Sequence, residues 1–343
     1  MVVGIQRLRA TLSGDLGTAL FGVVGVIAVA WVVFLTVQQG PRAMIATLII
    51  GITDGSIYAL IALGYTMVYG IIELINFAHG DVFTLGAFIA LPLFAAFGIG
   101  PGAHYSLAFI PILLLVFVLV MLINGLVNIT IERIAYRPLR NAPRLAPLIT
   151  AIGMSFIIEG AMYLWRGPVN LRFPDLIPEN RYTTSLVDIG VKDVMVIVAT
   201  VFLVVMLSLF INKTKLGKAM RATAQDRDAA ALMGIDINRT IAATFFIGAA
   251  LAGAGGLIYA LYFNSIRFDL GFSAGLVAFT AAVLGGIGNI EGAALGGLLI
   301  GVIRAINERY VSASWSDVVI FSILVMVLVF RPTGLLGMRV PEK

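Results

Sequence analysis

The sequence predicts an all-α membrane protein, a polytopic transmembrane helical bundle of about ten spans with short or broken helices and both termini in the cytoplasm. Of its 343 residues, 60% are hydrophobic and only 12% are charged, whereas soluble domains are about one quarter charged. Apolar stretches of about 20 residues recur, which is the length that crosses the hydrocarbon core of a bilayer. Charged residues gather between these stretches, as expected for a multi-pass protein.

The predicted spans follow one another along the chain. They cover residues 18–37, 44–68, 82–97, 107–129, 147–165, 194–211, 241–262, 276–287, 293–306 and 318–330. The first span has too long an apolar run for a signal peptide and no A-x-A-like cleavage site follows, so we expect an uncleaved helix. Asp54, Gly64 and Gly70 interrupt the second span, and glycines interrupt 276–306. Broken helices in transporters often line the transport path.

The charges between the spans predict their orientation. Segment 131–146 holds four arginines against Glu132, and both terminal tails are basic, so these parts belong in the cytoplasm. Segment 166–193 balances four basic with four acidic residues and fits the outside, and its three prolines argue against a long helix. The span count gives the same parity. Because the net charge of +5 lies mostly in loops and tails, membrane orientation explains it better than nucleic-acid binding.

A polar segment, 212–239, separates two long apolar runs. It carries six basic and three acidic residues. Asp226 can accept hydrogen bonds from the first turn of a helix, the residues from Ala229 to Met233 are good helix formers, and Gly234 can end the helix in a left-handed conformation. The segment therefore predicts a short capped helix at the membrane surface, suited to a groove in a partner. The alternative is a loop that is basic for topological reasons alone.

The order Asp228-Ala229-Ala230-x-x-x-Gly234 resembles the EAA-x-x-x-G signature of bacterial ABC importer permeases, with Asp in place of the usual Glu and without the later apolar-proline tail. In that family this loop is the coupling helix, which docks onto the ATPase subunit. The resemblance implies a coupling role for residues in and beside the motif. They are Arg221, Asp226, Asp228, Ala229, Ala230 and Gly234.

The sequence predicts no catalytic, cofactor or metal site. It has no cysteine and only two histidines, and it lacks a Walker-type phosphate loop. Asn76, His79 and Thr280 are candidates for the translocation path, because segment 76–81 and the glycine-broken region 280–301 hold most of the irregular or polar membrane sequence. We expect these two regions to face each other or a partner subunit. The alternative is that segment 76–81 is only the end of a loop at the inner surface.

Five stretches together resemble one family, the branched-chain amino acid permease subunit of bacterial ABC importers. They are YALIALGYTMVYGIIELINFAHGD (58–81), ERIAYRPLR (132–140), the DAAALMG loop, FTAAVLGGIGNIEGAALGGLLIG (279–301) and FRPTGLLG (330–337). The similarity covers residues 44–337, so the predicted domains are a tail with an extra helix (1–43), the permease domain and a cytoplasmic tail (338–343).

The resemblance implies a non-enzymatic subunit in a bacterial inner membrane that imports leucine, isoleucine, valine or other neutral amino acids. It also implies its partners: a second related permease, two ATPases and an extracytoplasmic binding protein. Related permeases carry urea and short amides, so the substrate stays open. Another alternative is a secondary transporter that works without ATP through Glu73, Glu159 or Glu291, although each lies near a span end. A membrane enzyme would need a catalytic cluster that the sequence does not offer.

Overall fold

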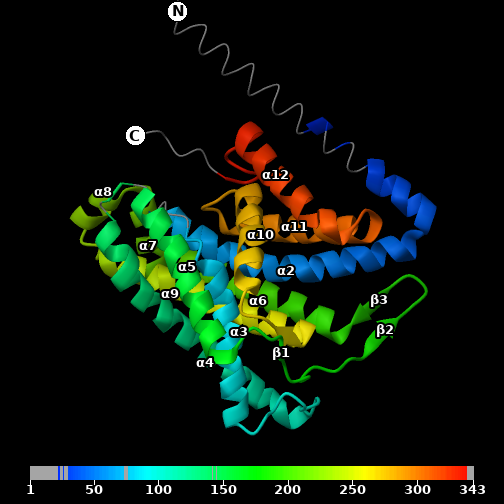
Figure 1. The fold of residues 1–343 in the computed structure, drawn as a ribbon. Coiled ribbons are helices and arrows are strands. Elements are labelled where there is room, and N and C mark those ends of the chain that lie inside the picture. Colours follow the sequence, from blue (N-terminus) through cyan, green and yellow to red (C-terminus); the bar gives the residue numbers. More distant parts are fainter. Residues whose placement is uncertain are drawn as a thin grey trace, which may run out of the picture.

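The computed structural model describes residues 22–23, 26, 30–72, 76–140, 142–143 and 145–337. Within them the chain is a bundle of helices, eight of which are long and apolar enough to cross a membrane (Figure 1). The helices are α2 (Pro41–Ile72), α3 (His79–Ala96), α4 (Ile110–Ile131), α5 (Leu145–Arg166), α6 (Val191–Lys213), α7 (Lys215–Gln225), α8 (Arg227–Leu232), α9 (Ile237–Phe263), α10 (Leu270–Gly285), α11 (Ile290–Tyr310) and α12 (Ser316–Phe330).

Nine of the ten predicted spans coincide with a helix. One of these helices, α10, has only 16 residues, and residues 286–289 separate it from α11, as the glycines of 276–306 predicted. The predicted first span lies largely outside the described residues, and its described end belongs to a helix over Ala30–Gln39. The termini themselves, 1–21 and 338–343, also lie outside the described residues.

The prediction that α2 is interrupted was wrong, because the helix runs through Asp54, Gly64 and Gly70 without a break. A transmembrane helix satisfies its backbone hydrogen bonds internally, so glycine inside it is tolerated where neighbours pack closely. The predicted loop after residue 131 is also partly helical. There α4 continues through a π turn (Glu132–Tyr136) and a 3₁₀ turn (Arg137–Leu139).

Glycines set the contact between α2 and α11, the most extensive helix pair of the bundle. A Cβ atom placed on Gly51 would lie 2.7 Å from the Cα of Val302, and one on Gly301 would lie 2.3 Å from the Cα of Gly55. No side chain therefore separates the two backbones at these points. The spacing Gly297-x-x-x-Gly301 is typical of transmembrane helices that pack this closely.

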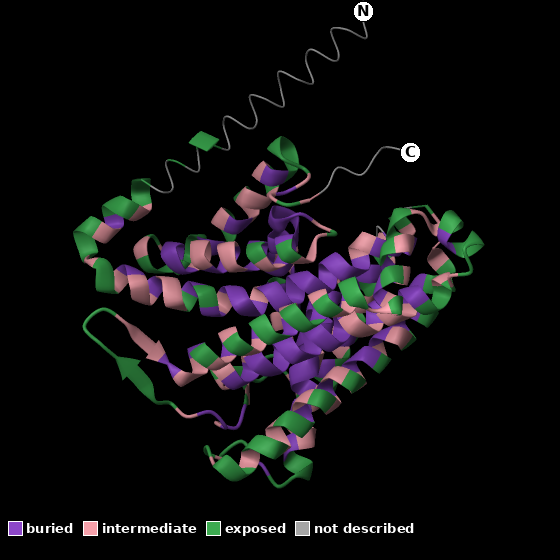
Figure 2. Cartoon of the chain, turned by 180° about the vertical axis from the view of Figure 1, so that it is seen from behind, coloured by how far each residue is buried: buried purple, intermediate pink, exposed green. Residues whose placement is uncertain are grey.

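Buried asparagines join α4 to its neighbours α3 and α9. The Asn124 side-chain amide donates to the carbonyls of Val82 (2.9 Å) and Ala249 (3.0 Å), and that of Asn128 donates to the carbonyl of Phe245 (2.9 Å). Polar bonds of this kind between transmembrane helices each contribute about 0.6–2 kcal/mol. Figure 2 shows that burial concentrates in the middle of the bundle, with the exposed faces outward.

The bundle has two distinct ends, which both views place far apart (Figures 1 and 2). At one, the coupling end, lie α7 and α8. At the other, the hairpin end, β2 (Arg181–Thr183) pairs antiparallel with β3 (Asp188–Gly190), and β1 (Leu171–Arg172) pairs with β4 (Ser265–Ile266). Helices α2 and α9 run from one end to the other, so each contributes residues to both ends.

The hairpin was not predicted from the sequence, which indicated only the absence of a long helix there. Arg181 donates to Asp188 across the two strands at 2.9 Å, and this bond holds the pKa of the Asp188 carboxyl below its usual value. Asp193 accepts from the Gly190 backbone (2.8 Å) and from the Tyr262 hydroxyl (2.9 Å), which ties the hairpin to α6 and α9. The hairpin is therefore a fixed part of this end.

Candidate functional site

The coupling segment, residues 212–239, contains two helices instead of the one predicted. Helix α8 has the predicted ends: the Asp226 carboxylate accepts from the backbone N–H groups of Asp228 (2.9 Å) and Ala229 (3.0 Å), and Gly234 has a φ of +82°. The additional helix, α7, is strongly two-sided, with Gly217, Met220 and Thr223 buried and its charged residues outward. A basic segment of this composition looked like a loop in the sequence because its apolar face is only a few residues wide.

The two alanines of the DAA motif point in different directions. Ala229 is exposed, whereas Ala230 is buried against the protein itself with 4% of its surface accessible. Two large apolar residues at the end of α8 are highly exposed, Leu232 (89%) and Met233 (84%). The sequence analysis did not single out these two residues, although two large apolar side chains beside a helix-ending glycine were the available signal.

Two arginines attach the coupling segment to the transmembrane helices. Arg227 donates from Nη2 to the carbonyl of Ile71 at 3.0 Å, so the start of α8 is bonded to the last turn of α2. Arg221, one of the predicted coupling residues, donates to the carbonyl of Ile211 near the end of α6. A cation at a helix C-terminus is favoured by the helix dipole. The start of α8 is therefore attached to the end of α2.

The three path candidates are all buried. Asn76 (3% exposed) accepts from the Tyr136 hydroxyl at 2.7 Å, His79 is fully buried, and Thr280 is fully buried with its hydroxyl bonded to the Leu276 carbonyl of its own helix at 3.0 Å. Segments 76–81 and α10 do meet, since a Cβ on Gly80 would lie 2.1 Å from the carbonyl oxygen of Gly271. This contact lies at the start of α10, before the predicted region 280–301, so the expectation that segment 76–81 faces that region stays a prediction.

Aromatic side chains surround His79 and form what we call the aromatic layer, made of Tyr65, Phe77, His79 and Phe279. The ring centroids of Tyr65 and His79 are 4.9 Å apart, and those of the Tyr65–Phe279 and Phe77–Phe279 pairs are 6.0 Å apart. The layer fills the space between α2, the start of α3 and α10. It leaves Asn76, His79 and Thr280 outside the cavities described next.

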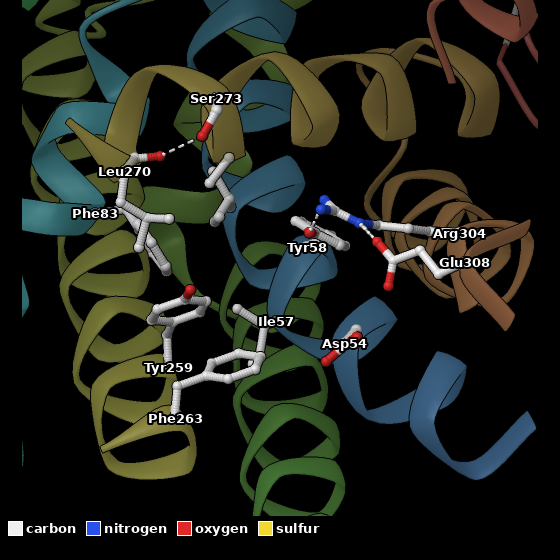
Figure 3. A pocket seen from close by; sticks show the side chains of 12 residues that line it. Asp54, Ile57, Tyr58, Phe83, Tyr259, Phe263, Leu270, Ser273, Arg304 and Glu308 are labelled. Atoms are coloured by element: carbon white, nitrogen blue, oxygen red, sulfur yellow. Dashed lines mark hydrogen bonds and ion pairs between the residues drawn. The ribbon is translucent and has the colours of Figure 1, made fainter. Parts of the chain in front are cut away.

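A cavity of about 240 Å³ opens between α2, α9, α10 and α11 toward the hairpin end (Figure 3). Its lining combines charges with apolar and aromatic side chains. The residues are Asp54, Ile57, Tyr58, Ile61, Phe83, Tyr259, Phe263, Leu270, Ser273, Ala274, Arg304 and Glu308. A second cavity, about 580 Å³, adjoins it and shares Tyr259, Leu270 and Ser273. The second cavity includes Ser265 and Ile266 of β4, and the first reaches Ile61, one helical turn before Tyr65 of the aromatic layer.

Comparison with known families gives a match over residues 47–328 to the branched-chain amino acid transport system permease component. That span is most of the chain. The chain belongs to this family. It is accordingly a multi-pass membrane transport subunit and not an enzyme, and the family resemblance drawn from its motifs is confirmed.

Individual permeases resemble the chain over nearly their whole length. It is 44% identical to the high-affinity branched-chain amino acid transport system permease protein BraD of Pseudomonas aeruginosa, over 86% of this chain and 96% of that protein. It is 41% identical to the corresponding LivH of Escherichia coli, over 85% and 95%. A probable LivH of Methanocaldococcus jannaschii is 28% identical, over 82% and 89%. No solved structure matches the chain.

Proposed function

We propose that this permease is the membrane-spanning subunit of an ATP-driven importer that carries branched-chain or other neutral amino acids across a bacterial inner membrane. Its partners would be a second related permease, two ATPase subunits and an extracytoplasmic binding protein. The relatives named for high-affinity branched-chain amino acid transport support the substrate class. The observation that carries the proposal is the bond between Arg227 and Ile71, which joins an exposed docking helix to a helix that walls the cavity.

In this proposal ATP closes the ATPase pair and displaces α8, which carries Leu232 and Met233 into the ATPase surface. Arg227 passes the displacement to the end of α2. Since α2 is one unbroken helix, the movement reaches Tyr58 and Asp54 at the cavity, about 20–26 Å from Ile71 at 1.5 Å per residue. Helix α2 then works as a lever, and its contact with α11 opens or narrows the cavity.

The translocation path is proposed to run from the hairpin end through the cavity and then through the aromatic layer. Asn76, His79 and Thr280 are kept as path residues on this basis, because they lie at or beside the layer that closes the cavity toward the coupling end. Rearrangement of Tyr65, His79 and Phe279 would open the way onward. The small residues around them, such as Gly64, Gly80 and Gly275, allow the helices to shift without large side chains colliding.

Reconstitution of the four kinds of subunit in liposomes tests the proposed function. We expect leucine uptake that requires ATP, the ATPases and the binding protein. Uptake driven by a proton gradient without ATP would instead support a secondary transporter, for which Asp54 inside α2 would be the natural proton carrier. ATP-driven uptake of urea without uptake of leucine would overturn the substrate class but still support an ATP-driven importer.

The proposal also fixes orientation, with the coupling end in the cytoplasm and the hairpin end outside. The sequence contains no cysteine, so each introduced cysteine is labelled uniquely. We expect an impermeant maleimide to label Ser185→Cys in the exposed hairpin on intact cells. Gln225→Cys, at the exposed end of α7, should react only after permeabilisation. The reverse pattern would show that the bundle is inserted the other way.

A further inference from the structure

The cavity at the hairpin end places both signs of charge inside the membrane bundle. Asp54 reaches it from α2, and Arg304 and Glu308 reach it from α11 (Figure 3). Ionisable side chains within transmembrane helices are costly and usually mark a site of function. The question is which ligand would use an anion and a cation side by side.

Arg304 is held in a fixed position. Its Nε donates to Glu308 Oε1 at 2.7 Å, and its Nη1 donates to the Tyr58 hydroxyl at 2.5 Å. Among the described residues, no hydrogen bond uses the remaining Nη2 group. A guanidinium that is held in place and keeps an unused N–H donor is suited to binding a carboxylate.

Asp54 lies one helical turn before Tyr58 on the same face of α2, so its carboxylate lies near the guanidinium that Tyr58 holds. In the part of the chain that the structure describes, no hydrogen bond or ion pair engages this carboxylate. Arg304 does not require Asp54 as a counter-ion, because Glu308 already pairs with it at the i,i+4 spacing. Asp54, Glu308 and Arg304 together leave one negative charge facing the cavity, which attracts a cationic group.

The rest of the lining is apolar. Ile57, Ile61, Phe83 and Ala274 are buried and form its inner wall, and the tilted rings of Tyr259 and Phe263 pack with centroids 4.4 Å apart. The volume of about 240 Å³ lies just below the roughly 300–1,000 Å³ of pockets for drug-sized ligands. It therefore fits a molecule the size of one amino acid.

We propose that this cavity binds the transported molecule by its main-chain end: Arg304 takes the carboxylate and Asp54 the ammonium group of a free α-amino acid. Its side chain then lies against Ile57, Ile61 and Phe83. The inference rests on the proposed function and adds to it a substrate site within the permease. The polar contacts bind only the charged main-chain groups, which all α-amino acids share. The apolar wall then accommodates the side chain of leucine, isoleucine or valine alike.

The test measures binding to the complete permease–ATPase complex without the binding protein, by equilibrium dialysis. The probes are leucine, leucinamide (no carboxylate) and the α-keto acid of leucine (no ammonium). We expect Asp54→Asn to weaken leucine and leucinamide about tenfold, the size of one charge-assisted hydrogen bond, and to spare the keto acid. Arg304→Gln should weaken leucine and the keto acid and spare leucinamide. The matched controls Asp317→Asn and Arg309→Gln, exposed and outside the cavity, should change none of the three.

This crossed pattern separates recognition from structure, because a variant that merely disturbs the fold loses all three ligands together. Equal losses for all three, unchanged affinities, or no binding of leucine by the original protein would each overturn the inference. ATP-driven uptake by the same preparations distinguishes failure of this site from failure of the proposed function. If wild-type uptake is present but the variants bind as the controls do, only this site is wrong. If wild-type uptake is absent, the proposed function fails.

Discussion

Leu232→Glu is expected to abolish ATP-driven uptake while leaving the membrane bundle folded. Leu232 is 89% exposed at the end of α8 and touches little of its own chain, so the change costs the isolated permease almost nothing. In the complex its side chain would be buried against the ATPase. Losing that burial removes about 2 kcal/mol, and a buried unpaired carboxylate adds more. We expect ATPase association to weaken at least about a hundredfold.

Co-purification of the ATPase and uptake in liposomes measure this effect. Gln225→Glu is the matched control, because it adds the same charge at an exposed position on α7 without removing an apolar contact. It should retain both association and uptake. If Leu232→Glu also retains both, then the end of α8 does not contact the ATPase and the coupling segment is an ordinary basic loop.

We expect substitution of Ala230 to act differently from substitution of its neighbours in the motif. Because it is buried within the protein, a large side chain there would displace α8 from its seat and also strain the bond from Arg227 to Ile71. The sequence motif alone treats Ala229 and Ala230 as equivalent small residues. Only the folded segment shows that Ala229 is exposed and that Ala230 faces the bundle.

Local chemistry in the coupling segment was predictable from the sequence, and contacts between distant helices were not. A cap at Asp226 and a left-handed Gly234 depend on the residues within one turn, so the short helix followed from them. The hydrogen bond from Arg304 to Tyr58 depends on which faces of α2 and α11 meet, across 246 residues of chain. The glycines of α11 are visible in the sequence, but nothing in it identifies α2 as the helix they meet.

The continuity of α2 is a second feature that the sequence alone did not predict. Asp54, Gly64 and Gly70 suggested a broken helix because each is unfavourable in an isolated one. In the bundle each meets a specific neighbour: Asp54 faces the charged cavity, and Gly64 makes room for the His79 ring, whose Nε2 would lie 2.0 Å from a Cβ at that position. Residues that looked like helix breaks in the sequence are therefore positions where α2 contacts its neighbours or the cavity.

Gly301→Ala is expected to destabilise the permease by about 3 kcal/mol, the upper part of the range for overpacked cores. The added Cβ would lie 2.3 Å from both the Cα and the N of Gly55 and 2.4 Å from the carbonyl oxygen of Gly51. These are backbone atoms of α2, so no side-chain rotation relieves the clash and the two helices must separate. Thermal unfolding in detergent should shift strongly, and uptake should fall with it.

Gly153→Ala in α5 is the matched control, since a Cβ there meets nothing within 4 Å. We expect unchanged or slightly higher stability, because alanine favours a helix over glycine. If Gly301→Ala is as stable as this control, the crossing of α2 and α11 is looser than the structure indicates. Separation of these helices would also move Arg304 away from Tyr58 and Asp54. A Gly301→Ala protein that remains folded should therefore lose affinity for leucine even where its ATPase association is intact.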